Sequence, residues 1–514
     1  MSSVPLTLGR STSNRFVLRW FPFVTSAVPV LALILLFFFQ LGARDLVSSH
    51  EARAAQNSQR MLDTGEWGLP TLFDEQRDLQ KPPGYYWLGA VAGYLDGGRV
   101  SPWAARFPAA ASSILAVLLV YGFLRRESGK TTALVAAVAL GTANHFITIG
   151  RTARIDVPLT CAVTVALFAF YRGTTAGVGT RVARREGWFV LSALAAGGAV
   201  LLKGPVGLAL IGSTAVAFLI AERFATAPAD RARLPLLSAI VGVIVVALVA
   251  VPWFVWAQHA TRGEFVRVFF WHHNVERFAG TSEALASHPW WYYGPRFAMA
   301  FLPWTLPLVP LVWWGLRSGV WKEDRAFRLG VVWLVVMVAV LSASRFKRAD
   351  YLLPAFPGAA IALGCAAERW LTSRADARSA VRAKWGFGVL VAGALAVCPV
   401  MWIVVEPAEN ARQEKRPFAA AIREYAPKPQ TILLFRAESH LLAYHLGAPL
   451  HTLVEWGELR EVLAVPGPHA VVMPPEYVDE AERITGRKLV PVATLADFTS
   501  VRPPRPLVCL RTAE

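Results

Sequence analysis

A polar stretch near the N-terminus brings together residues that could move a proton and hold an anion. His50 and Glu51 are adjacent, and Lys81 precedes two prolines and then the pair Tyr85 and Tyr86. A carboxylate or a neutral imidazole can take a proton from a hydroxyl group, and a lysine can hold a phosphate. Because residues before proline avoid the helical region, Lys81 is presented in extended chain. The stretch predicts a polar site, although a plain turn at a membrane entry has a similar pattern.

The elements that must position these residues are membrane spans. Of 514 residues, 55% are hydrophobic and 17% are charged, against about 25% charged in soluble globular proteins. Mean hydropathy is +0.42, which excludes a disordered, fibrous or ordinary cytosolic protein. The net charge is +17. In so apolar a chain this excess indicates contact with anionic membrane lipids rather than with nucleic acid.

Apolar segments long enough to cross about 30 Å of hydrocarbon recur along the chain. They predict about eleven transmembrane helices, near residues 18–41, 104–124, 131–149, 155–172, 187–202, 204–222, 234–257, 296–317, 327–344, 351–369 and 386–404. The first is too long for a signal-peptide core, which favours an uncleaved anchor. A shorter stretch, Tyr85 to Tyr94, predicts an interfacial or re-entrant helix with its aromatic residues at headgroup level.

The positive-inside rule orients these helices. If the basic N-terminus is cytoplasmic, residues 42–103, residues 258–295 and everything after about residue 405 lie on the other side. The high arginine and alanine content favours a bacterial inner membrane. We therefore expect the active site and the C-terminal region in the periplasm.

Several cations oppose this orientation because they lie on or near the translocated side. They are Arg151, Arg154, Lys203, Arg262, Arg267, Arg277, Arg345, Lys347 and Arg348. Several charges at a membrane face where insertion disfavours them indicate an anionic ligand, and phosphate is the leading candidate. The alternative for any one of them is a side chain that extends to the lipid headgroups.

The C-terminal tail, from about residue 406, differs in kind. Its β-rich runs are Thr431 to Phe435, Ala470 to Met473, Leu489 to Ala493 and Leu507 to Leu510. They alternate with helical segments at Pro417 to Tyr425, Ser439 to Leu446 and Tyr477 to Ile484. The pattern predicts a small α/β domain. Its histidines, His440, His445, His451 and His469, are too spread for a metal cluster and are interpreted as surface or packing residues.

The external segments also contain short motifs in a fixed order. They are H-E-A-R at 50–53, M-L-x-T-G-E-W at 61–67, Q-K-P-P-x-Y-Y-W-L at 80–88, A-R-F-P at 105–108, R-I-D-V-P-L at 154–159, L-K-G at 202–204, F-F-W-H-H-N-V-E-R-F at 269–278, F-L-P-W at 301–304 and Lys347 with Y-L-L-P at 351–354. Over roughly residues 40 to 365 the chain resembles the bacterial aminoarabinose transferase of lipid A and its protein O-mannosyltransferase-like relatives, which are GT-C superfamily glycosyltransferases.

The resemblance implies a mainly α, polytopic GT-C fold. The apolar segments and the different tail predict a transmembrane domain, residues 1–405, and a periplasmic α/β domain, residues 406–514. The resemblance also implies transfer of a sugar, with inversion, from a polyprenyl-phosphate donor to a hydroxyl of lipid A, another glycan or lipid, or a protein. The acceptor oxygen then needs a general base, and the departing phosphate needs cations.

Residues matching the motifs take the implied roles. Glu51 is expected to be the base, with His50 as a substitute and Asp156 orienting the base, a metal or Arg154. The donor phosphate would be held by Lys203, Lys347, Arg277, Arg345 and Arg348. Other substrate contacts would come from Lys81, Tyr85, Tyr86, His273, Asn274 and Tyr351. His272 and His273 would point to different faces of a helix, so they are not a ready metal pair.

Two departures from the family pattern leave questions open. His50 stands where relatives carry aspartate, and Gln80 stands where they often carry glutamate, which removes a carboxylate that a divalent metal could use. A metal is thus compatible with the sequence but not required by it. The alternatives to an enzyme are a lipid or sugar transporter or flippase, and a silent relative that only binds a lipid-linked sugar.

Overall fold

The computed structural model describes residues 31–73, 76–176, 181–280, 287–373 and 377–400 of the helical part. In the C-terminal part it describes 403–404, 407, 415–426, 432–437, 440–447, 450–465, 467, 469–496 and 506–512. Of the expected N-terminal anchor, residues 31–38 are helical, and residues 18–30 lie outside the described part.

Seven helices in the described part are long and apolar enough to cross a membrane. They are α4 (Pro102–Glu127), α7 (Asp156–Thr174), α8 (Val182–Lys203), α9 (Pro205–Ala225), α10 (Leu236–Ala260), α15 (Arg325–Ala343) and the continuous segment Ala349–Thr372, which joins η3 (Ala349–Ala355) to α16 (Phe356–Thr372). Each matches a predicted span, and the chain is a multi-pass membrane protein.

Two further predicted spans are broken. Helices α5 (Lys130–Thr142) and α6 (Asn144–Gly150) are bent by 62°, and Trp290–Ala300 meets α13 (Thr305–Arg317) at 113°. With these pairs the described residues hold up to nine candidate spans. Helix α17 (Ala377–Val400) covers most of the last expected segment without meeting the same criteria. The expected number of eleven is therefore not confirmed.

The bundle packs through small residues. Every residue of α16 from Phe356 to Ala367 is buried. A methyl group added at Gly330 on α15 would lie 2.7 Å from the backbone nitrogen of Ala362 on α16. Because glycine lets the two backbones approach this closely, α15 and α16 form a tight pair. The remaining short helices, α12 (Tyr293–Ala300) and α14 (Val320–Glu323), lie at turns of the bundle.

Two short helices cover one end of the bundle. Helix α2 (Ser49–Thr64) begins at Ser48, whose hydroxyl accepts a hydrogen bond from the Glu51 N–H, and ends at Gly65 with a left-handed φ of 71°. Helix α3 (Gly84–Leu95) starts directly after Pro83. Its 12 residues span about 18 Å, too short to cross a bilayer. This confirms a short helix here.

The aromatic residues of α3 are not all where the sequence predicted them. Tyr85 and Tyr86 are buried in the protein rather than lying at headgroup level. The exposed face of α3 instead carries Leu88, Val91 and Tyr94. The reason is that α3 packs against α2 and α4, so the first turn points inward.

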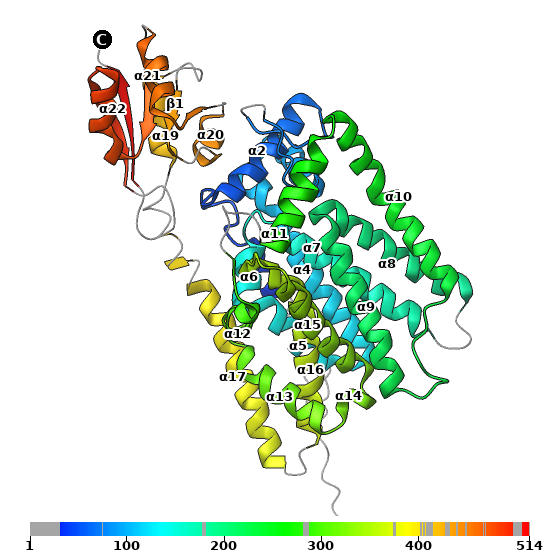
Figure 1. The fold of residues 1–514 in the computed structure, drawn as a ribbon. Helices are drawn as coiled ribbons and strands as arrows, with labels where there is room; N and C mark the ends of the chain where they lie inside the picture. Colours follow the sequence, from blue (N-terminus) through cyan, green and yellow to red (C-terminus); the bar gives the residue numbers. More distant parts are fainter. Residues whose placement is uncertain are drawn as a thin grey trace, which may run out of the picture.

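The C-terminal domain stands beside the bundle, next to α2 (Figure 1). Its sheet has the order β2-β1-β3-β5-β4, with β2, β1 and β3 parallel and β5 antiparallel to β3 and β4. The strands are β1 (Ile432–Phe435), β2 (His451–Leu453), β3 (Ala470–Met473), β4 (Leu489–Leu495) and β5 (Leu507–Thr512). The helices are α19 (Arg416–Tyr425), α20 (His440–Leu446), α21 (Trp456–Ala464) and α22 (Val478–Thr485). The predicted α/β domain is present, with β2 and α21 added.

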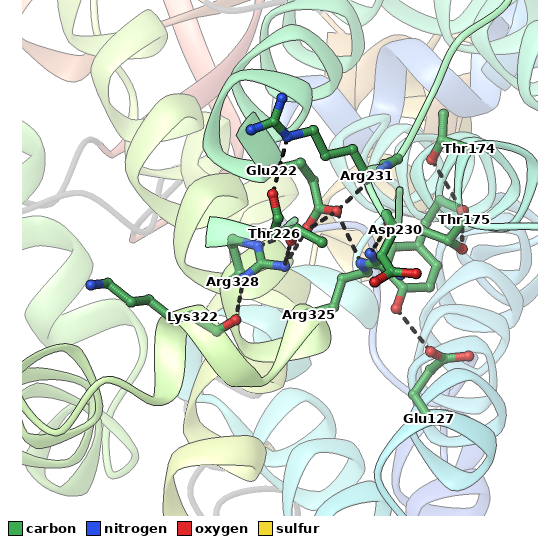
Figure 2. Close-up of polar contacts among 12 residues, drawn as sticks. Glu127, Thr174, Thr175, Glu222, Thr226, Asp230, Arg231, Lys322, Arg325 and Arg328 are labelled. Atoms are coloured by element: carbon green, nitrogen blue, oxygen red, sulfur yellow. Dashed lines mark hydrogen bonds and ion pairs between the residues drawn. The ribbon is translucent and has the colours of Figure 1, made fainter. Parts of the chain in front are cut away.

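A charged cluster fixes the opposite end of the bundle (Figure 2). Glu222 at the end of α9 is fully buried, and Arg328 on α15 donates to its Oε1 from Nε at 2.8 Å. Arg325 donates to Oε2 at 3.0 Å. Arg328 also donates to the carbonyl oxygen of Trp321 at 2.6 Å. These bonds tie α9, α14 and α15 together.

Candidate active site

A cavity of about 550 Å³ opens between the bundle and the external helices. Its apolar wall comes mainly from α7, α9, α15 and the π-helix η1 (Val266–Glu276), and includes Leu159, Pro205, Val206, Ala209, Leu210, Val340, Leu341, Phe269 and Phe270. Its polar lining includes Gln80, Lys81, Lys203, His273, Asn274, Arg277 and Tyr351. Six of these polar residues were predicted as site residues. The cavity thus joins a long apolar surface to a group of cations.

Lys203 is held at the junction of three helices. It is the last residue of α8, and its Nζ donates to Oδ1 of Asp156, the first residue of α7. The same Nζ lies 3.9 Å from the centre of the Tyr351 ring. Gly204 follows with a φ of 79°, so that α9 can start at once. Lys203, Asp156 and Tyr351, which the sequence singled out separately, therefore lie together.

Lys81 reaches the same place because α3 begins against α8. A methyl group at Gly84 would lie 2.7 Å from the carbonyl oxygen of Leu201, so only glycine allows this approach. Burial and the charge of Lys203 lower the pKa of Lys81 to about 8, although the charge of Asp156 acts to raise it. Within the described part of the chain, the Lys81 ammonium donates no hydrogen bond. It is a cation with donors still free for a ligand.

Arg277 and His273 line the cavity from η1 and the turn after it. The Arg277 Nε and the His273 Nδ1 are buried and have no hydrogen-bond partner among the described residues. Buried polar atoms without partners require an explanation, and a ligand in the cavity supplies one. Burial and the neighbouring Arg277 charge lower the pKa of His273 to about 4, so the ring is neutral.

The adjacent His272 points elsewhere. It is exposed, and its Nδ1 lies 2.6 Å from Oε2 of Glu276. The two histidines occupy different faces of the helix, as the sequence predicted. Asn274 also lines the cavity, but its Nδ2 donates to the Phe269 carbonyl oxygen at 2.7 Å. No group of three or more His, Cys, Asp or Glu side chains that could hold a metal occurs among the described residues.

Glu51 has a different environment from the one expected for a base. It is fully buried, and its carboxylate accepts four hydrogen bonds, from the Arg106 Nε at 2.8 Å, the Arg106 Nη2 at 3.2 Å, the Ala153 N–H at 3.0 Å and the Val47 N–H at 3.0 Å. Burial alone would raise its pKa, but the charge and hydrogen bonds of Arg106 lower it to about 2. The cavity lining does not include it. Glu51 therefore fixes the start of α2 and lies outside the cavity lining.

His50, its neighbour, is half-buried and lies within the field of several cations. Burial and the charges of Arg154, Lys81 and Arg348 lower its pKa to about 2. The imidazole is therefore neutral, and it can exchange hydrogen bonds with a hydroxyl group.

These features can be compared with known proteins. The protein family described as Dolichyl-phosphate-mannose-protein mannosyltransferase matches residues 80–256. An undecaprenyl phosphate-alpha-4-amino-4-deoxy-L-arabinose arabinosyl transferase of Pseudomonas aeruginosa is 32% identical over 344 residues, covering 66% of this chain and 59% of its own length. The arabinosyl transferase 1 of the same name in Pseudomonas fluorescens is 30% identical over 368 residues, covering 70% of this chain and 60% of its own length. The chain spans about 60% of the length of these curated relatives.

Solved structures share the architecture over nearly the whole chain. The crystal structure of ArnT from Cupriavidus metallidurans bound to undecaprenyl phosphate has a TM-score of 0.74 at 22% identity, covering 94% of this chain and 97% of its own. The archaeal oligosaccharyltransferase AglB of Archaeoglobus fulgidus has a TM-score of 0.55 at 12% identity, covering 89% and 70%. The chain has the GT-C fold. The resemblance to GT-C glycosyltransferases that its ordered motifs indicated is confirmed.

Within this GT-C fold, three cations expected at the phosphate lie outside the cavity lining. Lys347 is buried, and its Nζ donates to the carbonyl oxygens of His288, at 3.1 Å, and Ser344. It therefore joins two loops through backbone carbonyl oxygens. Arg345 is exposed. Arg348 lies 3.4 Å from Asp350, which also contacts Arg154 at 3.5 Å.

Tyr85 and Tyr86 also lie outside the lining. The Tyr85 hydroxyl donates to the Ala105 carbonyl oxygen at 2.8 Å, and the Tyr86 hydroxyl lies 3.4 Å from Oδ2 of Asp78. Through these contacts they hold α3 on the GT-C bundle. The two tyrosines are close to Lys81 in the sequence, but their side chains do not reach the cavity because α3 turns them inward.

Sequence reasoning missed the residues that support Lys81. The Arg53 Nη2 lies 2.5 Å from Oδ1 of Asp78, and its Nη1 donates to Oε1 of Gln80 at 3.0 Å. Asn57 also donates to Asp78, at 3.0 Å. This network fixes the segment that leads to Lys81. The available signal for Arg53 was its place in the H-E-A-R motif, one helical turn after His50. Asp78 lies outside every motif, so no sequence signal pointed to it.

Proposed function

We propose that this chain is an integral-membrane glycosyltransferase. It moves a sugar from a polyprenyl-phosphate-linked donor to an acceptor hydroxyl of lipid A, another glycan or lipid, or a protein, with inversion. The observation that carries the proposal is the cavity, in which an apolar wall of α9 and α15 continues to Lys81, Lys203 and Arg277. An amphiphile with one phosphate and a long hydrocarbon chain has the matching chemistry.

The cations divide the work on the donor phosphate. Arg277 supplies a planar guanidinium with an unsatisfied Nε, and Lys81 supplies a point charge with free donors. Both stabilise the charge that develops as the bond between the anomeric carbon and the phosphate oxygen breaks. The lipid chain lies along the residues of α9 and α15.

Asp156 replaces Glu51 as the proposed proton acceptor because, although it too lies outside the cavity lining, it is bonded to Lys203, which lines the cavity. Its Oδ1 accepts from Lys203, while Oδ2 accepts no hydrogen bond from another described residue. A bound phosphate draws Lys203 toward itself and leaves the carboxylate free to take the acceptor proton. The acceptor oxygen then attacks the anomeric carbon, and polyprenyl phosphate leaves. His50 orients the acceptor hydroxyl.

The relatives suggest the first donor to test. The two Pseudomonas relatives are named as arabinosyl transferases of undecaprenyl phosphate-alpha-4-amino-4-deoxy-L-arabinose. We propose the same class of donor here, in a bacterial inner membrane, with the site in the periplasm. Residues 1–405 form the transferase domain, and residues 406–514 form a periplasmic domain. A transporter or flippase is not favoured, because the named relatives are transferases.

The test is sugar transfer by the purified protein, with donor binding measured separately. We expect Asp156→Asn to bind donor but release no polyprenyl phosphate. Arg277→Gln should lose donor binding, while Arg125→Gln, an exposed arginine at the far end of α4, serves as the matched control. Full turnover by Asp156→Asn would overturn the proton-transfer role. Wild-type donor binding without any transfer would point instead to a silent relative. A chelator arm reports on metal dependence.

A further inference from the structure

The C-terminal domain contacts the external helices through one buried pair. His445 on α20 and Asp45 in the segment before α2 have side chains that are 8% and 9% exposed, and His445 Nε2 lies 2.9 Å from Asp45 Oδ2. Arg416 on α19 lies 3.9 Å from the other oxygen. Because both facing atoms are buried, replacing either residue removes the polar neighbour of the other in a dry environment.

Further contacts surround this pair. The Gln56 Nε2 on α2 donates to the His440 carbonyl oxygen at 2.7 Å, and the Tyr444 hydroxyl donates to the Val100 carbonyl oxygen at 3.0 Å. Leu441 and Leu442 of α20 are buried in the same apolar cluster as Ala52 and Ala55 of α2. Helix α20 is therefore packed on the helix that carries His50 (Figure 1).

The other side of the Asp45 segment is held by Arg106. Its guanidinium donates to the carbonyl oxygens of Leu41 at 3.0 Å, Arg44 at 2.8 Å and Asp45 at 2.7 Å. The same guanidinium binds Glu51, the neighbour of His50. One continuous chain of contacts thus runs from His445 through Asp45 and Arg106 to the first turn of α2.

We propose that His445 is a positioning residue, through which the C-terminal domain fixes residues 41–51 and sets the place of His50 at the active site. This inference rests on the proposed function for its effect on catalysis. Its structural part, the coupling of the C-terminal domain to residues 41–51, stands independently. A misplacement of the first turn of α2 would change catalysis without touching the groups that bind the donor.

The experiment compares His445→Gln with His451→Gln in the full-length protein. His451 is an exposed histidine of the same domain and serves as the matched control. We expect His445→Gln to lower kcat by about 10- to 100-fold, the size of effect that a small misplacement produces, with an unchanged KM for the donor. The double variant with His50→Ala should show no further loss, because both changes remove the same contribution.

Hydrogen exchange of residues 41–64 gives a second measurement that needs no turnover. Exchange should become faster in His445→Gln and stay unchanged in His451→Gln. Unchanged exchange, or a loss of kcat that adds fully to that of His50→Ala, would overturn the inference. If the wild-type protein transfers no sugar, the proposed function fails, while the exchange result still decides whether the C-terminal domain holds the α2 segment.

Discussion

Charged residues gather around both ends of the pair formed by α9 and α15, and the two groups are built differently. At one end, Glu222 accepts hydrogen bonds from Arg325 and Arg328 and is fully buried. A cavity of about 440 Å³ opens nearby, and both arginines on its wall, Arg325 and Arg369, form ion pairs. At the other end, Lys81 and Arg277 form no ion pair among the described residues. There, donors remain unsatisfied beside the 550 Å³ cavity.

The difference separates structural charges from ligand-binding charges. Leu210, which lines the 550 Å³ cavity, and Glu222 on α9 are separated by only about 18 Å of helix. What distinguishes the two ends is hydrogen-bond satisfaction. A saturated cluster gains nothing from an added anion, because its donors are already used, whereas unsatisfied donors on an apolar cavity favour a phosphate.

The largest expected effect is a loss of stability when a cation is removed from the saturated end. Arg328→Met should lower the free energy of unfolding by about 3–5 kcal/mol, because it leaves the buried Glu222 carboxylate with one arginine fewer. Thermal unfolding in detergent measures this loss. Sugar transfer per folded molecule should stay within about twofold, since the change lies far from the cavity. A selective loss of transfer with unchanged stability would reverse the assignment of this end as structural.

The second largest effect is a loss of transfer rate when a cation is removed from the end beside the 550 Å³ cavity. Lys203→Met should lower the rate of transfer by about 10²- to 10³-fold, because one cation no longer stabilises the departing phosphate. Lys322→Met is the matched control, an exposed lysine at the saturated end, and should transfer at the wild-type rate. Steady-state transfer measured on both variants at equal folded concentration tests this. Equal rates would show that the cavity cations do not act on the donor.

The helices that carry both ends were predictable, because their apolar runs are long. The strands β1, β3, β4 and β5 were predictable from β-rich composition. Strand β2 was missed because it has only three residues, two of them exposed. Helix α21 was missed although its capping box, Glu455 with Glu458, is a sequence signal.

The site was predictable in part. Cations that oppose the positive-inside rule included Lys203 and Arg277, which do line the cavity. The same rule selected Lys347, whose donors go to backbone carbonyl oxygens, and Arg151, whose Nη1 donates to the Leu36 carbonyl oxygen at 2.6 Å. Charge placement along a chain does not reveal partners. The surroundings of Glu51 were not predictable for this reason, because Arg106, which binds its carboxylate, lies on another helix.

The third prediction uses the titration of Lys81. Its pKa is lowered from 10.5 to about 8, so the cation is present below that pH and is lost as pH rises through it. The KM for the donor should therefore rise above about pH 8, by up to about tenfold per pH unit. Lys81→Arg keeps its charge and should show a flat profile over the same range. A wild-type profile as flat as that of Lys81→Arg would remove Lys81 from donor binding.

The smallest expected effect is on donor binding and comes from comparing two neighbouring histidines of η1. His273→Ala should weaken donor binding by about two- to tenfold, the range expected for one lost hydrogen bond. His272→Ala should have no effect on binding, because His272 is exposed and paired with Glu276. Equilibrium donor binding of both variants measures the difference. The two side chains are neighbours in the sequence and share their chemistry, so a general disturbance of the π-helix would weaken both variants alike. Only a ligand in the cavity would make donor binding depend on His273 and not on His272.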